Sequence, residues 1–284
     1  MSLSLQDKAV LNDSVEMPWL GLGVYLAQEG HEVENSVRYA LEAGYRLVDT
    51  AAFYKNEAGV GKAVRESGLA REQLFVTTKL WNADHGYNNT LRACERSLRA
   101  LNLEYIDLYL IHWPGFHRAD RLATWEAMLK LKEQQKVRSV GVSNFMPHQI
   151  DELIAAHGVV PSVNQVELHP FNAQKELRQY AKEKGIIITA WGPLFHGHFS
   201  EAPQWLSGIG QKYGKSAAQV VLRWHLQHGI SIIPKSVKPH RITENADIFD
   251  FALSSDDMAA IDALNQDKRY GAHPEKMTVG FENI

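Results

Sequence analysis

Short hydrophobic runs of strand length recur along the chain, and segments with the period of an amphipathic helix separate them. There are eight such runs, at residues 18–25, 45–51, 74–80, 105–113, 137–144, 162–168, 185–192 and 230–236. Most neighbouring runs begin roughly 25–30 residues apart, the length of a β-α unit, which favours parallel strands joined by right-handed crossovers. The pattern therefore predicts strands and helices that alternate along the chain.

Signals for helix ends agree with this alternation. The helical segments 32–44 and 217–229 both close on a glycine, a residue that commonly terminates helices. Ser254 stands where it can cap a helix over 254–265. Further helical segments are expected at 60–68 and 71–75, whereas the tail from Asp267 to Ile284 has no clear period.

Eight β-α units without a linker or a shift in composition favour a closed (β/α)8 TIM barrel over an open doubly wound sheet. The fold class is then α/β, with residues 1–284 in a single domain. Two short strand-like stretches surround an Asn-Asp-Ser turn within residues 8–18. They predict an N-terminal β-hairpin that closes the barrel bottom.

Composition narrows the function classes without choosing one. With 45% hydrophobic and 22% charged residues, the chain is typical of a globular protein. A net charge of −3 provides no general field for nucleic acid or an anionic membrane, so neither is an expected partner. No run approaches the ~18 apolar residues of a membrane span, and the start has no apolar leader, which predicts a cytoplasmic protein.

The single cysteine, Cys94, excludes an intrachain disulfide or a cysteine-based zinc site. It lies in an amphipathic helical pattern over residues 90–102, which indicates burial as a small apolar residue. His196 and His198 have no apparent third ligand and are interpreted as surface loop histidines, so no metal site is predicted.

Ionisable and polar side chains stand at the ends of successive hydrophobic runs, where a packed core would carry apolar residues. Individually, Asp49 could cap a turn, Lys79 could extend to solvent and His112 could be a satisfied core histidine. Burying unpaired charges costs several kcal/mol each, however, and barrel strands bring their C-terminal ends to one rim. A functional site at that rim therefore explains these side chains better than burial in a core does; they are Asp49, Lys79, His112, Ser143, Asn144, Gln165 and Lys235.

The segments DTAAFYKNE, TTKLW, IHWP, GVSNF, NQVELHP and IPKS occur in this order and span most of the chain. Together they resemble the aldo-keto reductase superfamily, and the AWGPL segment is similar to the bacterial branch that includes 2,5-diketo-D-gluconate and methylglyoxal reductases. The resemblance implies an NADP-dependent oxidoreductase that reduces small aldehydes, dicarbonyls, keto sugars or keto acids. It also implies a monomer.

The resemblance assigns a catalytic tetrad to Asp49, Tyr54, Lys79 and His112. Tyr54 would be the general acid that protonates the carbonyl oxygen, although a free phenol titrates near ~10. The Lys79 ammonium is expected to lower the Tyr54 pKa, and Asp49 to keep Lys79 charged and oriented. His112 would hydrogen-bond the carbonyl oxygen.

The implied cofactor is NADPH (NADP⁺), yet the chain has no Rossmann fingerprint, because the glycines at 21–23 and 59–61 lack the third glycine. A barrel can bind the phosphates with the loops after strands 7 and 8, where residues 234–245 are rich in basic and hydroxyl side chains. The solvated basic loop is the alternative. The resemblance implies four groups of contacts: Lys235, Ser236, Val237 and Arg241 at the 2′-phosphate loop, Glu244 and Asn245 at the adenine, Ser143, Asn144, Gln165 and Trp191 at the nicotinamide, and Gly192 and Leu194 at the pyrophosphate.

Aromatic residues just past three strands, Tyr25, Trp81 and Trp113, are expected to surround the substrate carbonyl. The loop at 115–120 carries His117 and Arg118, a basic rim that would suit a keto acid.

Two other classes stay open from the sequence. One is a cofactor-bound sensor, since some relatives of this superfamily are accessory channel subunits. The other is a metal-dependent barrel hydrolase that uses Asp49, His112 and His169.

Overall fold

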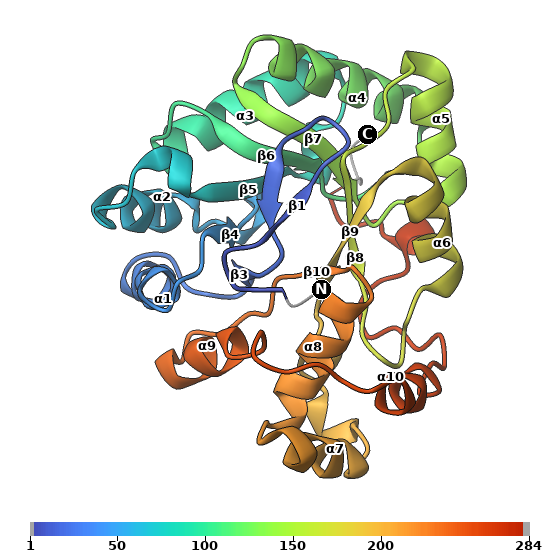
Figure 1. The fold of residues 1–284 in the computed structure, drawn as a ribbon. Coiled ribbons are helices and arrows are strands. Elements are labelled where there is room, and N and C mark those ends of the chain that lie inside the picture. Colours follow the sequence, from blue (N-terminus) through green and yellow to red (C-terminus); the bar gives the residue numbers. More distant parts are fainter. Residues whose placement is uncertain (1–2, 281–284) are drawn as a thin grey trace.

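In the computed structural model, which describes residues 3–280, eight parallel strands pair in chain order around a barrel (Figure 1). Parallel bridges from Leu20 to Ile232 and from Gly23 to Lys235 join the last strand to the first. The predicted (β/α)8 barrel is therefore confirmed. Its strands are β3 (Gly21–Gly23), β4 (Leu47–Asp49), β5 (Phe75–Leu80), β6 (Ile106–Ile111), β7 (Val137–Ser143), β8 (Val163–Glu167), β9 (Ile187–Trp191) and β10 (Ser231–Ile232).

Helices surround the strands (Figure 1). Each turns an apolar stripe inward, as α1 does with Val33, Val37 and Leu41, which are buried. Ser254 caps α10 as predicted, because its side chain accepts a hydrogen bond from the Asp257 amide. The helices are α1 (His31–Glu42), α2 (Glu57–Glu66), α3 (Tyr87–Leu101), α4 (Arg118–Glu133), α5 (Pro147–His157), α6 (Lys175–Lys184), α7 (Trp205–Tyr213), α8 (Ala217–Gln227), α9 (Pro239–Ala246) and α10 (Ser255–Asp262).

Two local predictions differ from the structure. The helix expected at 71–75 is one 3₁₀ turn over Arg71–Gln73, because the Phe75 amide already pairs with the Arg46 carbonyl and begins β5. The loop expected at 115–120 ends early, since α4 starts at Arg118.

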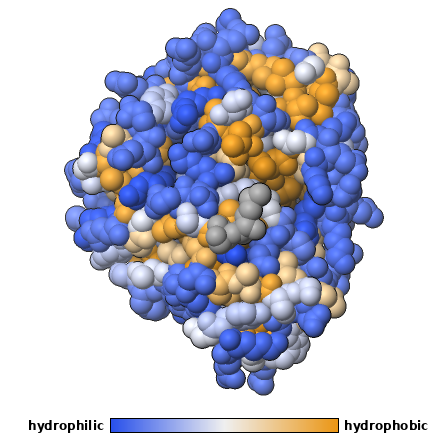
Figure 2. All heavy atoms as spheres, viewed as in Figure 1, coloured by the Kyte–Doolittle hydropathy of each residue, from blue (hydrophilic) through white to orange (hydrophobic). Residues whose placement is uncertain are grey.

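The N-terminal hairpin lies across the barrel end where the strands begin, as predicted (Figure 1). Its strands β1 (Lys8–Val10) and β2 (Glu16–Pro18) pair antiparallel. Leu11 and Met17 of this segment are buried in a cluster with Leu47, Phe75 and Val163, which stand at the starts of β4, β5 and β8. Hydrophilic side chains cover most of this face, with smaller hydrophobic patches between them (Figure 2).

Asp107 ties three strands together near the same end of the barrel. Its carboxylate is fully buried and accepts hydrogen bonds from Arg71, from Arg138 at 2.7 Å and from the Val76 amide at 2.9 Å. Such a charge is tolerated because each of its oxygens is paired. This end of the barrel is thus stabilised separately from the end that carries the polar rim.

Cys94 is buried, as predicted, and burial raises its pKa to about 12, which leaves the thiol unreactive at neutral pH. Among residues 3–280, no helix is long and apolar enough to cross a membrane.

Candidate active site

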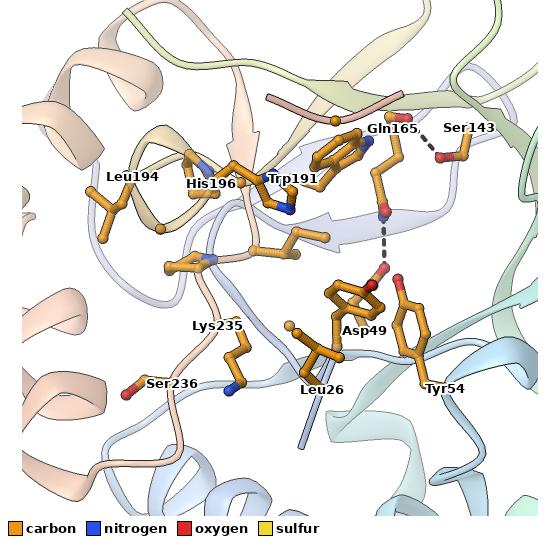
Figure 3. Close-up of a pocket in the computed structure, with 18 of the residues that line it drawn as sticks. Leu26, Asp49, Tyr54, Ser143, Gln165, Trp191, Leu194, His196, Lys235 and Ser236 are labelled. Atoms are coloured by element: carbon orange, nitrogen blue, oxygen red, sulfur yellow. Dashed lines mark hydrogen bonds between the residues drawn. The ribbon is translucent and has the colours of Figure 1, made fainter. Parts of the chain in front are cut away.

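A pocket of about 730 Å³ opens at the C-terminal ends of the strands (Figure 3). Lys79 lies beneath its lining, and Val237 does not line it because that side chain packs against the core. The pocket brings together the other residues predicted from sequence, namely Tyr25, Asp49, Tyr54, Trp81, His112, Trp113, Ser143, Asn144, Gln165, Trp191, Gly192, Leu194, Lys235, Ser236, Arg241, Glu244 and Asn245.

A fully buried ion pair forms the base of this site. Lys79 is 0% and Asp49 2% exposed. The Lys79 Nζ donates to Asp49 Oδ1 at 2.5 Å, to the Thr50 carbonyl at 2.9 Å and to the Tyr54 hydroxyl at 3.3 Å. The other Asp49 oxygen accepts from Gln165 Nε2 at 2.7 Å (Figure 3). All three ammonium protons thus have acceptors, which is the condition under which such a pair is tolerated in a core.

The backbone after β4 places Tyr54 beside this pair. The chain makes one 3₁₀ turn over Ala52–Tyr54. Asn56 holds the turn, since it accepts from Thr50 Oγ1 at 2.7 Å and donates to the Val24 carbonyl at 2.9 Å. The strand-ending carboxylate and the phenol five residues later are therefore brought to one lysine by a fixed loop.

Burial raises the pKa of Tyr54, and the Lys79 ammonium only partly opposes that effect. This corrects the expectation that Lys79 brings the Tyr54 pKa below its ordinary value. Burial acts to lower the pKa of Lys79, but Asp49 and Tyr54 together outweigh it and the Lys79 pKa is raised. At neutral pH the lysine is charged and the phenol keeps its proton.

His112 follows β6 and lines the same end of the pocket. Burial, and then the Lys79 charge, lower its pKa well below the ordinary value, so the imidazole is neutral at neutral pH. Its ring meets Tyr54 edge-on at 5.7 Å and Trp81 at 5.3 Å between ring centres. Within residues 3–280 the buried Nδ1 has no hydrogen-bond partner, which favours the tautomer with the proton on Nε2.

Buried neutral histidines make the fold sensitive to acid. Burial, and then the Arg121 charge, lower the pKa of His85 from 6.5 to about 4. The unfolded chain binds that proton more readily, so the fold loses roughly 3 kcal/mol of stability as the pH falls from 6.5 to about 4, and this stability is fully present above pH 6.5. Chemical denaturation across this pH range should show that the free energy of unfolding falls less with pH in His85→Gln than in the wild-type protein. The variant His31→Gln, at an exposed position, should follow wild type; parallel curves for all three would contradict the assignment.

Asn144 fixes the Trp191 indole in the pocket wall. Trp191 Nε1 donates to Asn144 Oδ1 at 2.9 Å, and Asn144 Nδ2 donates to the His112 carbonyl at 3.0 Å. Ser143 Oγ donates to the Gln165 carbonyl at 2.7 Å (Figure 3). These polar residues at the ends of β7 and β8 are therefore held by one another, and they present a rigid aromatic surface to the pocket.

The far end of the pocket is basic. Lys235 and Arg241 are both exposed and flank the start of α9, and within the described chain neither makes an ion pair. Ser236 Oγ accepts from the Lys238 amide at 3.1 Å, which shapes the turn into that helix. Two unpaired cations beside a helix N-terminus suit an anionic group.

Aromatic side chains form the near end. Phe53 stacks on Trp81 with ring centres 3.8 Å apart, and Tyr25 packs against Tyr54 at 5.0 Å. The basic rim expected from His117 and Arg118 is not found there, because Arg118 belongs to α4 and its Nε lies 3.9 Å from a Glu152 carboxylate oxygen. The near end is thus apolar, not cationic.

Sequence reasoning expected the loop at 195–205 and the tail to carry substrate specificity, but it did not identify which residues of these segments line the pocket. Gly271, Ala272 and Met277 of the C-terminal segment line the pocket, and so does His196 after β9. The segment has no helical or strand period that could have signalled this position. Residues 281–284 of the tail lie outside the described residues.

The metal-hydrolase alternative requires Asp49, His112 and His169 to act together. His169 Nε2 instead pairs with Glu167 at 3.1 Å, and no group of three His, Cys, Asp or Glu residues between 3 and 280 could hold a metal ion. The loop histidine His198, also without a metal role, stacks on Tyr270 with ring centres 4.1 Å apart and contacts Glu201.

Comparison with known families identifies the family of this chain. A family model described as the aldo/keto reductase family matches residues 20–266. The chain belongs to the aldo/keto reductase family. The predicted family and the predicted oxidoreductase class are therefore confirmed.

Members of the family resemble this chain along nearly its whole length. Glyoxal reductase of Bacillus subtilis (strain 168) is 53% identical over 277 residues, which cover 98% of this chain and 99% of the relative. Methylglyoxal reductase DkgA of Yersinia pestis is 45% identical over 274 residues, with 96% and 98% covered. The solved structure of a Gox0644 mutant in complex with NADPH has a TM-score of 0.90 and 43% identity, with 96% and 98% covered.

Proposed function

We propose that the chain is an NADPH-dependent reductase of small neutral aldehydes and dicarbonyl compounds, with Tyr54 as the general acid. The observation that carries this proposal is the Tyr54 hydroxyl, held 3.3 Å from a buried, charged Lys79 at the apolar end of the pocket. The names of the glyoxal and methylglyoxal reductases support the substrate class. We also propose that residues 1–284 form one domain, since the eight described barrel strands belong to one sheet.

The chain's own residues supply the proton. NADPH, when bound, supplies the hydride to the carbonyl carbon. Tyr54 donates its proton to the carbonyl oxygen, and Lys79 stabilises the phenolate that remains. His112, neutral and protonated on Nε2, donates a hydrogen bond to the same oxygen and orients it. Asp49 touches neither reactant and keeps Lys79 charged and directed at the phenol.

The pocket suits the cofactor along its length. Its volume of about 730 Å³ far exceeds the needs of a three-carbon dicarbonyl. Lys235, Ser236 and Arg241 would hold the 2′-phosphate, with Glu244 and Asn245 beside the adenine. The Trp191 indole would stack on the nicotinamide, near Ser143, Asn144 and Gln165. Gly192 and Leu194 would offer backbone amides to the pyrophosphate.

Charge in the pocket selects against carboxylate substrates. Lys235 and Arg241 stand at the cofactor end, whereas the carbonyl end is lined by Tyr25, Trp81 and Trp113. A keto acid would leave its carboxylate without a cation at that end, which costs binding energy.

A substrate panel tests this function. NADPH oxidation should be faster, as kcat/KM, with methylglyoxal and glyoxal than with 2,5-diketo-D-gluconate or pyruvate. A higher kcat/KM for the acids would overturn the substrate class. Tight NADPH binding without turnover of any carbonyl would instead favour the sensor.

Arg241→Ala should weaken NADPH binding about 10- to 100-fold, because a hydrogen bond to a charged group contributes roughly 1.5–3 kcal/mol. NADH, which lacks the 2′-phosphate, should bind almost as before. Direct titration with each nucleotide measures the two dissociation constants. The matched control is Arg92→Ala on α3, whose guanidinium bonds Asn89 on the helix surface. Equal losses for NADPH and NADH would remove Arg241 from the phosphate site.

A further inference from the structure

Glu167, the last residue of β8, is a fully buried carboxylate that the proposed chemistry does not use. It stands two residues after Gln165, so strand alternation turns both side chains to the same side of the sheet. One of its oxygens accepts from the Tyr270 amide at 2.7 Å and from His169 Nε2 at 3.1 Å. The other accepts from the Gly271 amide at 3.0 Å.

These bonds hold backbone that lines the pocket. Gly271, Ala272 and Met277 form part of the lining, and the chain between them has only one 3₁₀ turn, at Pro274–Lys276. Asn82 holds the far side of this segment, with Nδ2 donating to the Val279 carbonyl at 2.7 Å. Residues 270–279, which we term the C-terminal strap, are therefore fastened on both sides of the pocket.

The strap also meets the Trp191 indole. A Cβ added at Gly271 would lie 2.5 Å from the Trp191 ring and 3.0 Å from the Glu167 carboxylate. Figure 3 shows a short segment in the red of the C-terminal region beside the Trp191 side chain. Only a glycine backbone fits between the carboxylate and the ring, so the Glu167 bonds set how closely the strap packs on the indole.

Hydrogen bonds from His169 and the strap amides pair the Glu167 carboxylate without a mobile counterion. Burial acts to raise its pKa, but the hydrogen bonds from His169 and the two strap amides outweigh it and the pKa is lowered. The carboxylate is therefore ionised at neutral pH, and charge-assisted bonds of this kind are stronger than neutral ones. Glu167 holds the strap more firmly than a backbone carbonyl would.

We propose that Glu167 is a positioning residue for reduction: by clamping the amides of Tyr270 and Gly271, it sets the strap wall of the substrate pocket and the packing on Trp191. It contacts neither substrate nor cofactor in this role. The kinetic part of the inference rests on the proposed function. The structural part, that one carboxylate immobilises the strap, stands independently of it.

The test compares Glu167→Gln with Glu201→Gln. Glutamine keeps one acceptor oxygen, so one strap amide loses its partner. Glu201 accepts from Lys268 and from the Tyr270 hydroxyl at 2.9 Å on the surface, and holds no strap amide. Hydrogen exchange of the peptide containing residues 270 and 271 should be about tenfold faster in E167Q and unchanged in E201Q.

Steady-state kinetics and NADPH titration complete the test. In E167Q we expect KM for methylglyoxal and Kd for NADPH to rise about tenfold, with kcat much less affected, because the proton donor is untouched. Faster exchange with unchanged KM and Kd would show a merely structural clamp and overturn the proposal. If the wild-type protein reduces no carbonyl, the proposed function fails. Hydrogen exchange and NADPH affinity then test the role of Glu167 without the kinetic data.

Gly271→Ala is a second variant in case E167Q does not fold. It leaves Glu167 intact and displaces the strap from Trp191 by steric overlap. We expect the same rise in Kd and KM. The inference would be overturned if this variant kept the wild-type values for hydrogen exchange of the strap, Kd for NADPH and KM for methylglyoxal.

Discussion

Replacing Tyr54 with phenylalanine is expected to reduce kcat for carbonyl reduction by about 10²- to 10⁴-fold, the usual contribution of a positioned general acid. The ring and its packing against Tyr25 are kept, so only the hydroxyl that bonds Lys79 is lost. NADPH affinity should hardly change, because the phenol faces the carbonyl. Steady-state kinetics and direct NADPH titration measure the two effects.

Tyr25→Phe is the matched control. It removes a phenol from the same pocket, at a ring 5.0 Å from Tyr54, without touching Lys79. Its kcat should stay within about tenfold of wild type, since no proton transfer is lost. If Y54F and Y25F had similar activities, Tyr54 would not be the acid.

Lys79→Met is expected to cost both stability and activity. It leaves the Asp49 carboxylate 2% exposed with Gln165 as its remaining side-chain partner. Breaking a buried ion pair in this way destabilises a fold by about 3–5 kcal/mol. Turnover should fall strongly as well, because no charge stabilises the Tyr54 phenolate. Denaturant unfolding and kcat are the measurements.

The double variant Asp49→Asn with Lys79→Met separates these two effects. Removing both charges should recover much of the stability, as the buried site no longer holds an unpaired ion, but should recover little activity. Lys62→Met, which breaks a solvent-accessible, part-buried ion pair to Glu34, should change stability little. Recovery of activity in the double variant would show that Lys79 acts only structurally.

The opposing effects at Tyr54 fit its proposed task. A general acid must carry its proton at the start of the reaction, and burial ensures this by raising the Tyr54 pKa. Lys79 then favours the phenolate once the proton has left. An ammonium that lowered the pKa far below neutral pH would leave no proton to donate.

Much of the fold followed from local patterns. The eight strands and the hairpin at 8–18 were predictable because side-chain alternation and turn residues act over a few positions. The 3₁₀ turn at Arg71–Gln73 was not, since the Arg46 carbonyl that pairs with the Phe75 amide belongs to a distant part of the chain, immediately before β4.

Many of the site residues could likewise be selected from sequence. Asp49, Lys79 and His112 are costly to bury in a core and stand at strand ends. This combination indicates a candidate site before any coordinates are known. Arg118 shows the limit of such reasoning. Its basic character suggested a substrate contact, but the start of α4 carries it toward Glu152.

By itself, the sequence determined the barrel, the order of its strands and the chemical types at its rim, because hydrophobic period and residue chemistry are properties of short segments. Only the tertiary structure decided that Lys79 meets three acceptors, that burial outweighs its charge at Tyr54, and that Glu167 holds the strap against Trp191. These outcomes depend on which distant groups exclude water from a side chain or supply its hydrogen bonds, and no local pattern encodes those partners.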